Sequence, residues 1–186
     1  MKRTPTTQPA INPFARFRRE HRSVLGRLDR LESAVLTRRP TRASEALLRE
    51  AVAHFEDQFG THMAAEDAVL FPAVGANLPE ARETLAPLAN EHVALRSMLA
   101  TLQQTLERPH GRARDEQLVV QTRDLVDLLR IHIEKEEAVV FALAERVLRP
   151  RDLRELAQHI RPFTHPSRTA APPRRTSRRQ SKGKAS

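Results

Sequence analysis

Apolar side chains recur every three or four residues along four long segments of the chain, which is the spacing of one buried face of an α-helix. The pattern predicts four amphipathic helices of roughly six or seven turns, separated by turns at 39–41, 75–79 and 108–111. Pro87 lies near the start of the third segment, where we expect the helix to begin or to kink. The predicted buried stripes are Phe14, Phe17, His21, Val24, Leu28, Leu31 and Val35; Leu48, Val52, Phe55, Phe59, His62, Glu66, Val69 and Ala73; Leu85, Leu88, His92, Leu95, Leu99, Leu102 and Leu106; and Leu118, Thr122, Leu125, Leu129, His132, Glu136, Val139, Leu143 and Val147.

The connections between these segments are short, and short connections between long helices produce antiparallel neighbours. We therefore predict an all-α protein that forms an up-down-up-down four-helix bundle over residues 13–150. A flexible N-terminus, 1–12, precedes the bundle. A short terminal helix within 151–165 and a disordered basic tail, 166–186, follow it.

The chain contains an internal repeat. The segment HMAAEDAVLF at 62–71 recurs 70 residues later as HIEKEEAVVF at 132–141. The dipeptide Glu-His at 20–21 likewise recurs at 91–92, 71 residues later. The repeat predicts a duplicated helix pair, with two copies of one half-site around a pseudo-twofold axis.

Polar residues interrupt the apolar stripes at one height. Each predicted helix carries one His within its stripe, and the second and fourth helices add a Glu four residues later on the same face. In antiparallel neighbours, two residues are level when they are equally far from the connecting turn. The midpoints between successive stripe histidines, 41.5, 77 and 112, fall in the connecting segments RPTR, GANLP and RPHGRAR, which places all four imidazoles in one layer. The polar residues of this layer are His21, His62, Glu66, His92, His132 and Glu136.

Buried carboxylates are costly unless they are paired or bind a cation, so this layer favours a metal site. Four neutral imidazoles and two carboxylates are too many ligands for one tetrahedral zinc ion. They fit two metal ions, each with two His ligands and with both Glu residues as bridges. Imidazole combined with carboxylate suits iron, with manganese or zinc as alternatives. The competing interpretation is a cluster of core histidines without metal.

Acidic residues next to these candidate ligands have two interpretations. Glu20 and Glu91 precede ligand histidines and lie about 100° further round their helices. They could accept a hydrogen bond from an imidazole N–H on a neighbouring helix, but we favour a solvated helix face for both. We expect Asp67 and Glu137 to be exposed as well.

These motifs resemble the hemerythrin-like HHE cation-binding domain family over about residues 13–150. The resemblance is carried by the two Glu-His dipeptides, by HxxxE followed by an acid and AVLFP at 62–72, and by a second HxxxE at 132–136. It implies a hemerythrin-like bundle that holds two iron ions as a non-haem di-iron centre with an oxo or hydroxo bridge. The metal ligands that it implies are His21, His62, Glu66, His92, His132 and Glu136.

The ligand set differs from that of the family's oxygen carriers. Those proteins have a fifth His on the third helix, whereas this chain has Leu88 and Arg96 at the candidate positions. Their last carboxylate is an Asp five residues after the His, whereas Glu136 follows His132 by four. Four His and two Glu resemble more closely the bacterial repair-of-iron-centres proteins, which are linked to nitrosative and oxidative stress.

The composition narrows the chemistry further. The chain of 186 residues has no Cys, which excludes disulfides, zinc fingers, iron–sulfur clusters and thiol catalysis, and no Tyr, which excludes a tyrosyl radical. It has no apolar run long enough for a transmembrane helix, and its first residues lack the apolar part of a secretory signal. We therefore expect a cytoplasmic protein without membrane contact, and a monomer.

The net charge of +9 is unevenly distributed along the chain. Residues 166–186 hold seven Lys or Arg and no acidic residue, which leaves a net charge of +2 for residues 1–165. Cations on a flexible segment suit weak, non-specific and salt-dependent contact with nucleic acid. A tail that only improves solubility is the alternative, and it is the one that we favour.

The sequence therefore predicts a non-haem di-iron protein that binds or reduces a small ligand, namely oxygen, nitric oxide or peroxide, in a redox or nitrosative stress response or in sensing. No residue is assigned a catalytic role, and whether the chain is an enzyme stays open. One alternative is iron storage or trafficking. Another is a regulatory metal sensor that uses its basic tail to contact nucleic acid.

Overall fold

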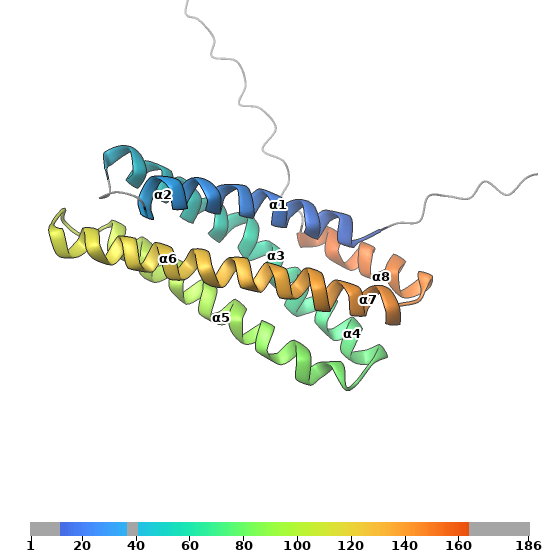
Figure 1. Cartoon of the computed structure of the whole chain (residues 1–186). Coiled ribbons are helices and arrows are strands. Elements are labelled where there is room, and N and C mark those ends of the chain that lie inside the picture. Colours follow the sequence, from blue (N-terminus) through green and yellow to red (C-terminus); the bar gives the residue numbers. More distant parts are fainter. Residues whose placement is uncertain (1–11, 37–40, 164–186) are drawn as a thin grey trace, which may run out of the picture.

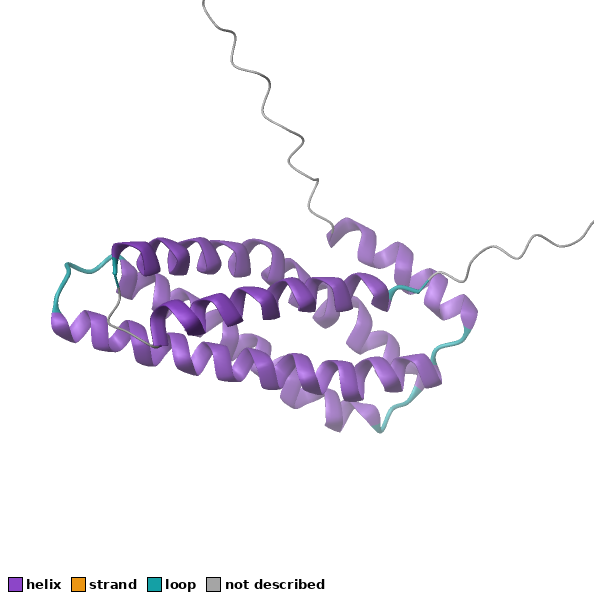
Figure 2. Ribbon diagram, turned by 45° about the horizontal axis from the view of Figure 1, so that its top comes forward, coloured by secondary structure: helices purple, strands orange, loops and turns teal. Residues whose placement is uncertain are grey.

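The structure is a computed structural model that describes residues 12–36 and 41–163. Four helices run alternately up and down in an elongated bundle, and a fifth, shorter helix lies against one end (Figure 1). The described residues contain no β-strand, and every long element is helical (Figure 2). The predicted all-α, up-down-up-down architecture with a short extra helix is confirmed. The predicted basic tail, 166–186, lies outside the described residues.

The bundle helices are built from α-helices joined by π-helical turns without a break in the chain direction. The first comprises α1 (Phe14–Leu31) and a π turn (Glu32–Leu36). The second comprises α2 (Arg42–His54), a π turn (Phe55–Phe59), α3 (Gly60–Ala65), a π turn (Glu66–Leu70) and α4 (Phe71–Asn77). The third is α5 (Ala81–Leu106), and the fourth comprises α6 (Arg112–Lys135), a π turn (Glu136–Phe141) and α7 (Ala142–Val147). The extra helix is α8 (Pro150–Ile160), followed by a 3-10 turn (Arg161–Phe163).

The start of α5 differs from one of our two expectations for Pro87. The helix begins at Ala81 and continues through Pro87, so a helix start at the proline is wrong. Proline lacks a backbone N–H, and at this position only the carbonyl of Glu83 loses its intrahelical donor. The predicted turn at 75–79 also narrows, because α4 extends through Asn77.

The π turns change which residues face the core. Up to Glu66 and Glu136, every residue of the four predicted stripes is buried. Beyond these two residues the buried positions lie one residue later than predicted, because a π turn accommodates one extra residue. The stripe residues that are not fully buried are Val69, Ala73, Val139, Leu143 and Val147, and the buried residues that replace them are Leu70, Val74, Val140, Ala144 and Leu148.

The apolar core is divided into two clusters by the polar layer. In α1, His21 lies between Phe17, which belongs to one cluster, and Val24, which belongs to the other. In α5, His92 lies in the same way between Leu88 and Leu95. The helices therefore bury most of their apolar surface above and below the layer. This apolar packing holds the polar side chains in place, although the apolar residues are not part of the layer.

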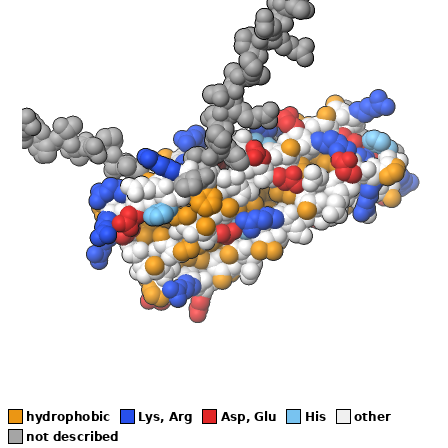
Figure 3. Space-filling model, turned by 180° about the vertical axis from the view of Figure 1, so that it is seen from behind, with side chains coloured by type: hydrophobic (Ala, Val, Ile, Leu, Met, Phe, Trp, Pro, Cys, Tyr) orange, Lys and Arg blue, Asp and Glu red, His pale blue; other side chains and the backbone are white. Residues whose placement is uncertain are grey.

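The surface of the described bundle carries charges of both signs. Seen from behind, acidic and basic side chains are interspersed with hydrophobic ones on the described part of the chain (Figure 3). No helix among the described residues combines the length and the apolar character needed to cross a membrane.

Candidate metal centre

The six predicted ligand side chains meet halfway along the bundle, and all six have no exposed surface. His21 comes from α1, His62 from α3, His92 from α5 and His132 from α6. Glu66 and Glu136 are each the first residue of a π turn. Every bundle helix therefore contributes one imidazole to a single layer, and the second and fourth helices also contribute a carboxylate.

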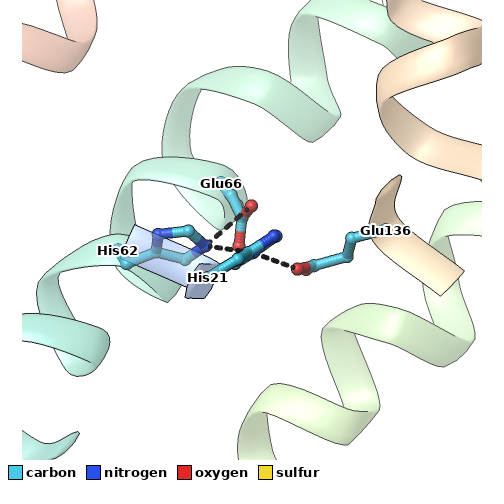
Figure 4. Close-up of side chains that lie close together, drawn as sticks. All are labelled: His21, His62, Glu66 and Glu136. Carbon is cyan, nitrogen blue, oxygen red and sulfur yellow. Dashed lines mark hydrogen bonds and ion pairs between the residues drawn. The ribbon is translucent and has the colours of Figure 1, made fainter. Parts of the chain in front are cut away.

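The first half-site joins the first two bundle helices. The Nε2 atoms of His21 and His62 are 3.0 Å apart. Oε1 of Glu66 lies 3.1 Å from Nε2 of His62, and Oε2 of Glu136 lies 3.1 Å from Nε2 of His21 (Figure 4). One ligand atom from each of these four residues lies within 4.8 Å of the others, so together they could hold one metal ion.

The second half-site joins the third and fourth bundle helices, and its ligand group comprises His92, His132 and Glu136. The Nε2 atoms of His92 and His132 are also 3.0 Å apart. Oε1 of Glu136 lies 3.0 Å from Nε2 of His132 and 3.3 Å from Nε2 of His92. Oε2 of Glu66 lies 3.6 Å from Nε2 of His92. Each Glu therefore directs one oxygen to each half-site, which is the position of a bridging ligand.

Three of the four oxygens of the two carboxylates lack a hydrogen-bond donor. Both oxygens of Glu66 and Oε2 of Glu136 are buried and accept no hydrogen bond. A buried carboxylate oxygen without a partner is costly, and a cation removes that cost. The donor set of the layer therefore fits a metal ion in each half-site.

Four carboxylates surround the layer and bind the other nitrogen of each imidazole. Nδ1 of His62 bonds to Glu20 at 2.8 Å, and Nδ1 of His132 bonds to Glu91 at 2.9 Å. The remaining two bonds join Nδ1 of His92 to Asp67 at 2.7 Å and Nδ1 of His21 to Glu137 at 3.0 Å. Each bond links one bundle helix to the next, so the four bonds close a ring around the layer. The preference for a solvated face at Glu20 and Glu91 is therefore wrong.

Three of these four outer carboxylates also hold a basic side chain. Arg16 lies 2.7 Å from Glu20, Arg96 lies 2.9 Å from Asp67, and Lys135 lies 2.5 Å from Glu91. Among the described residues, no basic side chain pairs with Glu137, whose side chain is 41% exposed. Asp67 is half-buried, so the expectation that both acids are simply exposed fails for Asp67, and both of them bind an imidazole.

The sequence contained a signal for these outer carboxylates. The two Glu-His dipeptides recur in the repeat, and so does an acid directly after each layer Glu. Each of these acids points about 100° away from the layer residue beside it on the same helix, so its carboxylate does not bind an imidazole of its own helix. The carboxylate binds an imidazole of a neighbouring helix instead, and only the packing of the helices shows which neighbour that is.

The electrostatics of the layer favour a positive charge. Burial of the His62 ring opposes protonation, but the charge of Glu66, the hydrogen bond to Glu20 and the close contact with Glu66 outweigh it and raise the pKa of His62 to about 10. Burial and the neighbouring charge of Glu136 raise the pKa of Glu66. Burial acts in the same direction on Glu136, but its close contacts with the rings of His132, His21 and His92 lower its pKa well below 4.5. Protons and metal cations therefore compete for the same nitrogen atoms.

Aromatic rings cover the imidazoles. Phe141 stacks on His21, Phe59 stacks on His62 and Phe71 stacks on His92, with ring centroids between 5.0 and 5.6 Å apart. Outside Phe71 lies a surface groove of about 470 Å³ between α4 and α5. Phe71 and Asp67, which both contact His92, line this groove.

The two candidate positions for a fifth histidine add no ligand. Leu88 is buried in the apolar core beside the layer, and the side chain of Arg96 binds Asp67 at the surface. The geometry therefore offers four His and two Glu.

The bundle and its buried His/Glu layer define a cation-binding helical domain. In agreement with this geometry, the hemerythrin HHE cation-binding domain matches residues 12–144, and the chain belongs to that family. No curated protein and no solved structure matches the chain.

Proposed function

We propose that the chain holds two iron ions between its six layer residues and binds or reduces oxygen, nitric oxide or peroxide there. His21 and His62 would hold one ion, His92 and His132 the other. Glu66 and Glu136 would bridge the two ions. Family membership supports cation binding, and the arrangement of nitrogen and oxygen atoms supports two ions rather than one.

The observation that carries the proposal is the 3.0 Å separation of the Nε2 atoms within each His pair. Each ring directs its Nδ1 to a carboxylate, so Nδ1 carries the proton and Nε2 presents a lone pair. Two lone pairs at this distance repel each other unless a proton or a metal ion lies between them. The two nearby carboxylate oxygens without donors favour the metal ion, which carries more charge than a proton.

The distances between ligand atoms favour a six-coordinate ion. Ligands at about 2.1 Å from an ion are about 3.0 Å apart at a right angle and about 3.4 Å apart at the tetrahedral angle. The Nε2 pairs at 3.0 Å, and the contacts of 3.0 and 3.1 Å to the carboxylates, match the right angle, whereas Nε2 of His92 lies 3.3 Å from Glu136 and 3.6 Å from Glu66. The donor set of imidazoles and carboxylates suits iron or manganese.

The layer residues supply fewer ligand atoms than a six-coordinate ion accepts. The first half-site offers two imidazole nitrogens and one oxygen from each Glu, which makes four. The second offers His92, His132 and Glu136, which makes three. Bound iron would supply an electron-rich, coordinatively open centre for a small ligand. The stacked Phe rings and the absence of Tyr and Trp from the sequence keep oxidisable groups away from it.

Metal analysis of the purified protein tests the proposal. We expect about two iron atoms per chain and a near-ultraviolet absorption band of an oxygen-bridged ferric pair. Mixing the reduced protein with oxygen should oxidise it without return. Recovery of the reduced form on flushing with argon would instead identify a carrier, and a protein isolated with one zinc ion would contradict the di-iron proposal.

The basic residues after 166 favour a second candidate, a sensor that contacts nucleic acid. Deletion of 166–186 should leave the iron content unchanged and should abolish any salt-sensitive binding to duplex DNA. Unchanged DNA affinity after the deletion would exclude the tail as the contact.

A further inference from the structure

Arg16 connects the C-terminal helix to the candidate metal centre. Its Nε donates to Oε1 of Glu20 at 2.7 Å, and Oε2 of the same carboxylate accepts from Nδ1 of His62 at 2.8 Å. Its other two nitrogens donate to backbone carbonyls at the end of α8 and in the turn that follows, namely Ile160 O at 3.1 Å and Phe163 O at 2.9 Å. The guanidinium of Arg16, together with the carboxylate of Glu20, therefore links the end of α8 to the imidazole of His62.

The same half-site is in contact with α8 by packing. The helix lies against the π turn Glu66–Leu70, and the 3-10 turn after it lies against α3, which carries His62. Leu156 and Ile160 are buried in the apolar cluster that also contains Phe17. The rings of Phe17 and His62 are nearly perpendicular, with ring centroids 4.9 Å apart. Hydrogen bonding and packing thus converge on the His62 side of the layer.

The other outer carboxylates have no such link. Within the described part of the chain, the side chains of Arg96 and Lys135 hydrogen-bond only to Asp67 and Glu91. The family match ends at residue 144, and α8 begins at Pro150. The connection through Arg16 is therefore specific to one of the four imidazoles and involves an element outside the family domain.

We propose that Arg16 is a positioning residue that couples the docking of α8 to metal binding at the His21–His62 half-site. The proposal rests on the proposed metal site. A carboxylate that holds Nδ1–H fixes the ring and increases the basicity of Nε2, and loss of such a partner weakens metal binding by about 10- to 100-fold. Arg16 fixes Glu20 in turn, and the end of α8 fixes Arg16.

The coupling acts in both directions. If docked α8 strengthens metal binding at this half-site, metal binding strengthens the docking of α8 by the same factor. Arginine suits this role because its three nitrogens donate to three acceptors from one rigid plane, which a lysine ammonium cannot do. The coupling therefore reaches Phe163, the last residue that the structure describes.

Hydrogen exchange and iron release test the coupling in the full-length protein. The variants are Arg16→Gln, Arg16→Lys and the matched control Arg96→Gln, which removes a cation from Asp67 without touching α8. Each protein is loaded with ferrous iron without oxygen. Amide exchange in 150–160 is measured with and without iron, and release of iron to a ferrous chelator is followed over time.

In the wild-type protein, iron should slow amide exchange in α8 by about 10-fold. Arg16→Gln should abolish this protection and should release one of the two iron ions about 10-fold faster, and Arg16→Lys should recover only part of both effects. Arg96→Gln should leave the protection of α8 unchanged. Leu156→Ala, which loosens α8 but keeps Arg16 and Glu20, should also speed the release of one iron ion.

Two results would overturn the coupling while leaving the metal site intact. One is iron-dependent protection of α8 that survives in Arg16→Gln. The other is an equal loss of protection in Arg96→Gln. A wild-type protein that takes up no iron would overturn the proposed function, and the coupling with it, so the two failures are distinguishable.

Discussion

Two clusters of charged side chains are buried at different heights of the bundle, and their bonding differs. Near the end of the bundle, Arg114 and Glu45 form a two-pronged pair with distances of 2.8 and 3.0 Å. The remaining donors of Arg114 bond to the backbone carbonyls of Thr105 and Leu106, which close the end of α5. The charges of this cluster are satisfied by protein groups.

In the central layer, by contrast, the charged and polar atoms do not all have partners within the protein. Three of the four oxygens of Glu66 and Glu136 accept no hydrogen bond, and the imidazole nitrogens face one another. His110 and Asp115 also lie close enough to Glu45 to form a group of metal-ligand type, but Arg114 already occupies that carboxylate. A buried charge that serves the fold has its partner within the chain, and the layer has ligand atoms left over for a cation from outside.

The largest expected effect concerns the two bridging carboxylates. The double variant Glu66→Ala, Glu136→Ala should lose iron from both half-sites together, from about two ions to almost none, because each Glu contributes to both sites. Iron content after purification and dialysis is the measurement. Glu134→Ala, which removes an exposed acid two residues earlier, is the control and should keep both ions. If the double variant still held two iron ions, the layer carboxylates would not be metal ligands, and the proposed difference between the two clusters would be wrong.

The Arg114 pair should respond in stability and leave iron content unchanged. Arg114→Met leaves Glu45 buried without its partner and should lower the free energy of unfolding by about 3 kcal/mol. Chemical denaturation measures the loss. Arg112→Met breaks a pair that is exposed on the same helix, and we expect it to cost about 0.5 kcal/mol or less. Equal losses in the free energy of unfolding for the two variants would show that the buried pair contributes no more than the exposed pair.

An outer carboxylate should have a smaller effect on metal binding than a bridge. Asp67→Asn keeps an oxygen that can accept from Nδ1 of His92 but removes the negative charge. We expect the dissociation constant for iron to rise about 10-fold. Competition with a chelator gives this constant, and Asp124→Asn, an exposed site on α6, is the control. An unchanged constant would mean that the ring of carboxylates only orients the imidazoles.

The smallest expected effect is the pH dependence of the Arg114 pair. Hydrogen bonds from Arg114 lower the pKa of Glu45 below its usual 4.5, in spite of the burial that opposes this shift. The stabilisation by the ionised carboxylate is therefore fully present above pH 4.5 and is lost as the pH falls through the lowered pKa. Wild-type protein should be more stable than Glu45→Gln by about 1 kcal/mol at pH 7, because Gln keeps an oxygen that accepts from Arg114 and loses only the charge. Denaturation curves from pH 7 to 3 in the presence of a chelator should show this difference shrink as the pH falls; a constant difference would contradict it.

The sequence allowed the bundle, the layer and its six members to be predicted, because all of them follow from periodicity and from distances to the turns. The one-residue shift of the buried positions beyond Glu66 and Glu136 could not be predicted, because the prediction assumed α-helical spacing where the chain forms a π turn. The carboxylate partners of the imidazoles did not follow either. Each bond joins neighbouring helices, and sequence spacing within one helix carries no information on the rotation of the next.

The ring of four bonds from imidazole to carboxylate also fixes how the helices are aligned along their axes. Each bundle helix provides one imidazole and one carboxylate, so a slip of any helix by one turn, about 5.4 Å, would break two of the four bonds. The alignment that brings the ligand atoms together is thus already specified by protons and carboxylates. A bound ion would then offset the repulsion between ligand atoms that the four bonds bring close together, so the ring of bonds and the ion would act on the same alignment of the helices.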